Sequence, residues 1–147
     1  METVKIYKLE AIDTIVQNDG SVIEEYYILG FFDSKKLYEK MVMKYRKLPG
    51  FCLDSCKFYQ IEYTFCNIKD EVKFVFYVSQ TTEGIEVAEE VVEIGVFLSE
   101  KEAAIAKSEY ESSIATNNGE NKQVFVERYI VNKPEWQEGF ERYTWYE

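Results

Sequence analysis

The feature that most constrains this fold is an internal repeat. At an offset of 65, residues 22–36 align with residues 87–101, and seven of the fifteen positions are identical. The identical pairs are Val22/Val87, Glu24/Glu89, Glu25/Glu90, Gly30/Gly95, Phe32/Phe97, Ser34/Ser99 and Lys36/Lys101. At an offset of 68, Val4-Lys5-Ile6 also resembles Val72-Lys73-Phe74. Self-similarity of this kind is typical of a repeated structural unit, so we interpret the chain as a tandem duplication.

Each copy is predicted to open with a β-hairpin. Residues 4–15 and 22–32 are rich in Val, Ile, Tyr and Phe, and they flank a turn whose Asp19-Gly20 pair favours a tight hairpin. In the second copy, residues 72–80 and 85–98 flank a turn at residues 82–84. The apolar alternation slips within the later strand, which predicts a β-bulge near Ala88–Val91.

A helix and a closing strand are predicted to follow each hairpin. Ser34 and Ser99 stand at N-cap positions, and Glu102 completes a capping box with Ser99. The two predicted apolar stripes are Leu37, Met41, Tyr45 and Leu48, and Ala103, Ala106, Tyr110 and Ile114. The first helix is expected to stop at Pro49-Gly50. Closing strands are expected at residues 57–65 and 123–131, with a last strand at residues 141–146.

These elements predict an α+β fold made of two tandem β-β-α-β units, residues 1–68 and residues 69–147. One such unit is barely stable alone at about 60 residues, because a sheet face and an edge stay exposed. We therefore expect antiparallel sheets, each covered by one helix, packed as a pseudo-dimer in one globular body. A continuous eight-stranded sheet formed by edge pairing is the alternative.

The negative charge is concentrated in the second half. Residues 1–66 carry nine basic and ten acidic side chains, a net charge of −1, whereas residues 67–147 carry eight and seventeen, a net charge of −9. Binding to nucleic acid requires a basic surface, so nucleic acid is disfavoured as a ligand and a basic protein is favoured as a partner. The longest charge-free stretch is nine residues, residues 74–82, and the N-terminus shows no secretory signal. We expect a cytoplasmic protein without membrane association.

The residue inventory argues against common catalytic and metal chemistry. The chain has no His, which removes the usual general base and the commonest metal ligand. Cys52 and Cys56 have a C-x3-C spacing, and with Cys66 they make an odd count that favours a reducing compartment. We interpret the three thiols as small core side chains and expect no metal and no cofactor.

Short motifs in both copies resemble a family of small uncharacterised bacterial domains. The first copy contains Gly30-Phe-Phe-Asp-Ser34, a helix, Pro49-Gly50-Phe51 and residues 58–63, which are similar to the family's hairpin, helix, Pro-Gly-Phe turn and strand. The second copy contains residues 93–99 and Trp136-Gln-Glu-Gly-Phe140, similar to the family's Ile-Gly-x-Tyr/Phe-Ser step and terminal Trp-x-Glu-Gly-Phe. The resemblance carries no established activity, but similar acidic domains are associated with immunity proteins that block toxins.

Two sets of residues are candidates for function. The C-terminal set is Glu135, Trp136, Glu138, Phe140 and Glu141, which has the composition of an aromatic anchor with an acidic rim, unless it folds over the sheet as core. The second set is Glu24, Glu25, Glu89 and Glu90, one of each pair lining a groove between the repeats. Adjacent strand residues face opposite ways, so neither pair is a catalytic dyad, and no catalytic residue is predicted.

The leading interpretation is a non-enzymatic, acidic protein-binding module, in its sharpest form an immunity or antitoxin-like protein that neutralises a basic partner. A small-molecule-binding domain with a ligand groove between the repeats is the alternative, and an enzyme using Glu89 or Glu90 is the third possibility. The sequence leaves the identity of the partner and the oligomeric state open.

Overall fold

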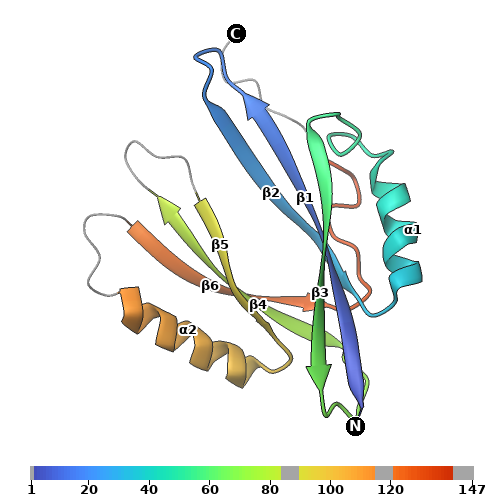
Figure 1. Cartoon of the computed structure of the whole chain (residues 1–147), viewed down its shortest axis with the longest axis vertical. Coiled ribbons are helices and arrows are strands. Elements are labelled where there is room, and N and C mark those ends of the chain that lie inside the picture. The colour runs from blue at the N-terminus through green and yellow to red at the C-terminus, as the bar shows by residue number, and fades with distance from the viewer. Residues whose placement is uncertain (1, 84–89, 115–120, 141–147) are drawn as a thin grey trace. The chain divides into compact units, whose positions relative to one another are not determined.

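Within the described residues the fold is α+β, with two three-stranded antiparallel sheets and two helices (Figure 1). The computed structural model describes residues 2–83, 90–114 and 121–140. The first four elements are β1 (Thr3–Val16), β2 (Val22–Phe32), α1 (Lys35–Tyr45) and β3 (Cys56–Cys66). The next four are β4 (Phe74–Glu83), β5 (Glu90–Phe97), α2 (Glu100–Ile114) and β6 (Asn121–Ile130). The predicted order of strand, strand, helix and strand therefore occurs twice. The predicted last strand, residues 141–146, lies outside the described residues.

The two sheets have the same strand order. The first is β2-β1-β3 and the second is β5-β4-β6, and in each the first strand of the unit is central. The chain divides into two compact units. One runs from the N-terminus to Lys69 and resumes at Asn132, and the other comprises Asp70–Val131. The sequence groups residues 132–140 with the second repeat, whereas the structure groups them with the first unit.

A β-bulge occupies the same position in both units. Leu9 pairs with Gly30 but Glu10 pairs with Ile28, so Leu29 is the extra residue of β2. Likewise Val78 pairs with Gly95 but Ser79 pairs with Glu93, so Ile94 is the extra residue of β5. Leu29 and Ile94 are aligned in the sequence repeat, which shows that the duplication includes the bulge. Of the predicted bulge at 88–91, residues 88 and 89 lie outside the described residues, and the pairing of Glu90 and Val91 is regular.

The repeated Gly-x-Phe sequence has a steric cause. A Cβ atom at Gly30 would lie 2.9 Å from the Phe32 ring, and a Cβ atom at Gly95 would lie 2.9 Å from the Phe97 ring. Each glycine therefore lets the aromatic ring two residues later on the same strand lie against its backbone.

The strand pairings correct the offset between the two central strands. Tyr7 pairs with Phe32 and Phe76 pairs with Phe97, so β1 and β4 are equivalent at an offset of 69 rather than 68. At this offset Ile6 is equivalent to Val75 and Leu9 to Val78, and all four side chains are fully buried. Because a one-residue slip moves every side chain to the other face of a sheet, only the offset of 69 preserves the core.

Both helices begin at the predicted caps. The Ser34 side chain accepts a hydrogen bond from the Leu37 N–H at 3.3 Å, and the Ser99 side chain accepts one from the Glu102 N–H at 3.1 Å. Helix α1 ends at Tyr45, earlier than the predicted stop at Pro49-Gly50.

Each unit contains a cluster of buried apolar side chains to which its helix contributes. Tyr38, Met41 and Tyr45 of α1 are buried in the first cluster, and Leu37 and Leu48 pack against it. In the second cluster Ala103 is buried, and Tyr110 and Ile114 pack against it. All four residues of the first predicted apolar stripe and three of the four in the second therefore contribute to a core.

The hairpin between β1 and β2 closes as predicted. The Gln17 N–H donates to the Ser21 carbonyl at 2.8 Å, and the Gly20 N–H donates to the Gln17 carbonyl at 3.0 Å. Gly20 has φ of +87°, a conformation that glycine adopts without steric cost. Part of the predicted turn at 82–84 lies outside the described residues.

Candidate functional site

The segment 132–140 is fixed to the first unit by backbone hydrogen bonds. The Asn132 N–H donates to the Phe31 carbonyl at 2.7 Å, and the Glu135 N–H donates to the Leu29 carbonyl at 2.8 Å. The Tyr45 hydroxyl donates to the carbonyl oxygens of both Leu29 and Glu135. These contacts place the segment along the edge of β2, at the position of the bulge.

Two glycines allow the end of this segment to lie directly on the Pro49-Gly50 turn. The Phe140 N–H donates to the Pro49 carbonyl at 2.9 Å. A Cβ atom at Gly139 would lie 2.2 Å from the Pro49 carbonyl oxygen, and one at Gly50 would lie 2.5 Å from the Phe140 carbonyl oxygen. The Pro-Gly-Phe and Trp-x-Glu-Gly-Phe motifs therefore meet within one unit, although Trp136 comes 85 positions after Phe51 in the sequence: 136 − 51 = 85.

Phe140 and Trp136 have different environments. Phe140 is buried and its ring is stacked on Tyr27, with the centroids 4.4 Å apart. Trp136 leaves 48% of its surface exposed, and its ring meets Tyr27 edge-on at 4.9 Å. Phe140 is thus part of the core, as one predicted alternative had it, whereas Trp136 is exposed, as the other had it.

Carboxylate residues lie close in sequence to both Trp136 and Tyr27. The Tyr27 hydroxyl donates to Glu25 at 2.9 Å, which links one candidate set of residues to the other. Glu138 is exposed within the turn that the hydrogen bond from the Gly139 N–H to the Trp136 carbonyl closes. Glu135 is partly exposed and lies 3.9 Å from the Lys133 ammonium. We call Glu25, Tyr27, Trp136 and Glu138 the Trp136 site. Glu141 lies outside the described residues.

Burial and negative charge raise the pKa values of two tyrosines next to this segment. Burial has the largest effect on the pKa of Tyr27, and the hydrogen bond and the charge of Glu25 raise it further. Burial also raises the pKa of Tyr45, with a contribution from the charge of Glu135. Both hydroxyls therefore remain hydrogen-bond donors throughout the neutral range.

The other predicted glutamates do not form a site with these residues. Glu24 is exposed and accepts a hydrogen bond from Tyr26, whereas its neighbour Glu25 accepts one from Tyr27. Glu89 lies outside the described residues, and Glu90 is described only by its backbone pairing with Thr82 at the start of β5.

Sequence reasoning missed one buried carboxylate. Asp13 is fully buried, pairs with Glu25 across the β1–β2 ladder, and accepts a hydrogen bond from the Ser55 hydroxyl at 2.7 Å. This bond holds the loop before β3 against the sheet. The signal was present, because Asp13 has the same strand parity as Ala11 and Ile15, which are buried.

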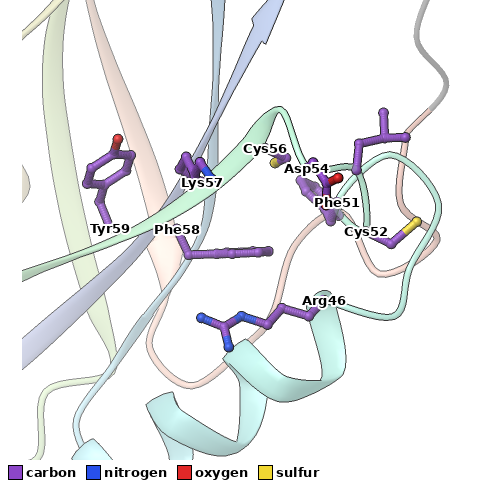
Figure 2. A pocket seen from close by; sticks show the side chains of 9 residues that line it. Arg46, Phe51, Cys52, Asp54, Cys56, Lys57, Phe58 and Tyr59 are labelled. Atoms are coloured by element: carbon purple, nitrogen blue, oxygen red, sulfur yellow. The ribbon is translucent and has the colours of Figure 1, made fainter.

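A shallow hollow of about 680 Å³ lies near the start of β3. Figure 2 shows Arg46, at the end of α1, directed toward the ring of Phe58, with its guanidinium carbon 5.7 Å from the ring centroid. Lys57, Asp54 and Cys52 also line this hollow. Cys52 and Cys66 are exposed and only Cys56 is buried, so the interpretation of all three thiols as core side chains was wrong for two of them.

Across residues 2–83, 90–114 and 121–140, no three Cys, Asp or Glu side chains are arranged to hold a metal ion. In the same part of the chain, none of the helices combines the length and the apolar character required to cross a bilayer.

Comparison with known proteins gives no assignment. No family model matches the sequence, and no match was found among curated proteins or solved structures.

Proposed function

We propose that this chain is a non-enzymatic protein-binding module whose Trp136 site engages a basic protein, in the manner of an immunity or antitoxin-like protein in the bacterial cytoplasm. In this proposal each helix covers its sheet and the two repeats pack as a pseudo-dimer. The net charge of −10 favours a cationic partner, because opposite charge accelerates encounter and like charge rejects acidic competitors.

The observation that carries the proposal is the exposure of Trp136. Tryptophan and arginine dominate the energetics of protein interfaces, and an indole face attracts a cationic side chain. Glu25 and Glu138 supply hydrogen-bond acceptors for a guanidinium or ammonium group. Trp136 also has φ of +52°, which is rare for a bulky residue and costs free energy unless the surrounding contacts hold it.

The test compares matched variants in binding to the protein that co-purifies from the source cells. Trp136→Ala is expected to weaken binding by about 30-fold, the size of an interface hot spot. Phe125→Ala is the control, because Phe125 is a similarly exposed aromatic, at 44%, in β6. The proposal fails if the two variants bind equally well.

The charge contribution is tested separately. Glu25→Gln with Glu138→Gln should lower the association rate and reduce its dependence on salt. Glu109→Gln with Glu111→Gln removes the same charge from the exposed surface of α2 and should change the rate less. Equal effects of the two double variants would show that net charge alone, not the Trp136 site, governs association.

The hollow near β3 favours a second candidate function, binding of a small molecule. Its volume of about 680 Å³ lies within the usual range for ligand sites, and Arg46 and Lys57 favour an anionic ligand. This hollow is within the first unit, whereas the sequence suggested a groove between the repeats. A screen of anionic metabolites by thermal shift, repeated with Arg46→Ala, tests this candidate; it is rejected if no compound raises the melting temperature.

A further inference from the structure

The two edges of the first sheet differ in their hydrogen bonding. At β2, the outward carbonyls of Leu29 and Phe31 accept hydrogen bonds from segment 132–140. At the other edge, the Thr14 N–H donates to the Ser55 carbonyl at 3.1 Å, and this pair continues the β1–β3 register. The odd-numbered residues of β3 are therefore the ones that form hydrogen bonds with β1. Because antiparallel pairs alternate, the even-numbered residues of β3 direct their backbone groups away from β1. In the described ranges, the outward backbone groups of Phe58, Gln60, Glu62 and Thr64 have no hydrogen-bond partner.

Strand β3 carries the charged residues Lys57 and Glu62, but it lacks three other features that usually prevent edge pairing. It is 11 residues long, contains no proline, and pairs with β1 without a register shift. Natural edge strands are commonly short, bulged or interrupted by proline, because an open edge is a template for another strand. Tyr59, on this strand, is 48% exposed.

The sequence of β3 is nearly symmetric about Ile61. Antiparallel pairing with a second copy centred on Ile61 places Gln60 opposite Glu62, Tyr59 opposite Tyr63, and Cys56 opposite Cys66. With the axis at Ile61, even-numbered residues of one copy lie opposite even-numbered residues of the other. These are the residues whose backbone groups point outward, so they can form the new hydrogen bonds. We propose that β3 is a self-association edge, where a second copy of this chain pairs antiparallel about a twofold axis at Ile61.

The side-chain chemistry of this register is favourable. The amide of Gln60 can donate to the carboxylate of Glu62 in the second copy, and the twofold axis repeats this pair. Residues 1–66 carry a net charge of only −1, from nine basic and ten acidic side chains, so repulsion at this edge is small for so acidic a chain. Lys5 lies 3.8 Å from Glu62 and further offsets its charge.

The test is sedimentation of the full chain over a range of concentrations up to about 1 mM. The wild type is expected to change from the 17.4 kDa monomer to a dimer. Gln60→Glu places two like-charged pairs across the axis and should raise the dissociation constant by about 2- to 30-fold.

Two further variants make the test specific to this register. Gln60→Glu combined with Glu62→Gln exchanges the two partners and should restore the wild-type dissociation constant. Gln123→Glu adds the same charge to an exposed position on β6 and should leave the dissociation constant close to that of the wild type. The proposal is overturned if the wild type stays monomeric, if the double variant does not recover, or if Gln123→Glu weakens the dimer as much as Gln60→Glu. No partner protein is used, so the outcome is independent of the Trp136 site.

Discussion

Replacing Gly139 by alanine tests the docking of the C-terminal segment on the first unit. Gly139 has φ of +79°, where an L-residue costs about 1–2 kcal/mol. The added Cβ atom would also lie 2.2 Å from the carbonyl oxygen of Pro49 and 2.9 Å from its Cδ and N atoms. Since backbone and ring atoms cannot move aside as a flexible side chain does, the segment must shift. The upper limit is loss of the buried Phe140 contacts, about 3–5 kcal/mol.

The expected loss of stability for Gly139→Ala is therefore about 2–5 kcal/mol. Gly20→Ala is the matched control, because Gly20 has φ of +87° and a Cβ atom there would meet nothing within 4 Å. It carries only the conformational cost of about 1–2 kcal/mol. Urea unfolding followed by circular dichroism gives both values, with the slopes compared to confirm a common unfolded state. Equal destabilisation by the two substitutions would refute the close contact between Gly139 and Pro49.

Three further predictions concern the elements around the site. Ser34→Ala and Ser99→Ala should each lower the free energy of unfolding by about 1 kcal/mol, measured by urea unfolding, because each removes a helix N-cap; no loss would mean that the caps contribute nothing. Tyr45→Phe should cost about 1–3 kcal/mol in the same assay, since two carbonyls lose their donor, and an unchanged stability would contradict the hydrogen bonds of Tyr45 to Leu29 and Glu135. Tyr27 and Tyr45 have pKa values raised above 10.0 in the folded state, so the stability they contribute is fully present below pH 10 and is lost as the pH rises above it. Phenolate absorbance should then show tyrosines that titrate only on alkaline unfolding, and titration of all twelve as one class near pH 10 would contradict the burial.

Local features of the fold were predictable because their causes are local. The Asp19-Gly20 turn and the two serine caps depend on residues within a few positions of each other. The offset between β1 and β4 was harder to predict from the sequence. The strand pairing determines it, and a shift of one residue leaves a similar apolar pattern in the sequence. The sequence predicted a bulge near Ala88–Val91, of which the structure describes only Glu90 and Val91, and it did not indicate the bulge at Ile94.

The candidate site was predicted in parts and not as a whole. Trp136 and Glu25 were each selected from the sequence, but for different surfaces. Their link through Tyr27 depends on the docking of Phe140 on Pro49, a contact between residues 91 positions apart: 140 − 49 = 91. No periodicity or spacing signals such a contact, which arises only when the segment after the second repeat returns to the first unit.

The proposed binding site requires that Tyr27 hold Trp136 at the first unit. Nuclear Overhauser spectroscopy measures this directly, since the two rings have centroids 4.9 Å apart and meet edge-on. Cross-peaks between the indole protons of Trp136 and the ring protons of Tyr27 are the predicted result, together with cross-peaks from Tyr27 to Phe140. Indole cross-peaks confined to sequence neighbours would contradict the claim and remove the basis for a binding site at Trp136.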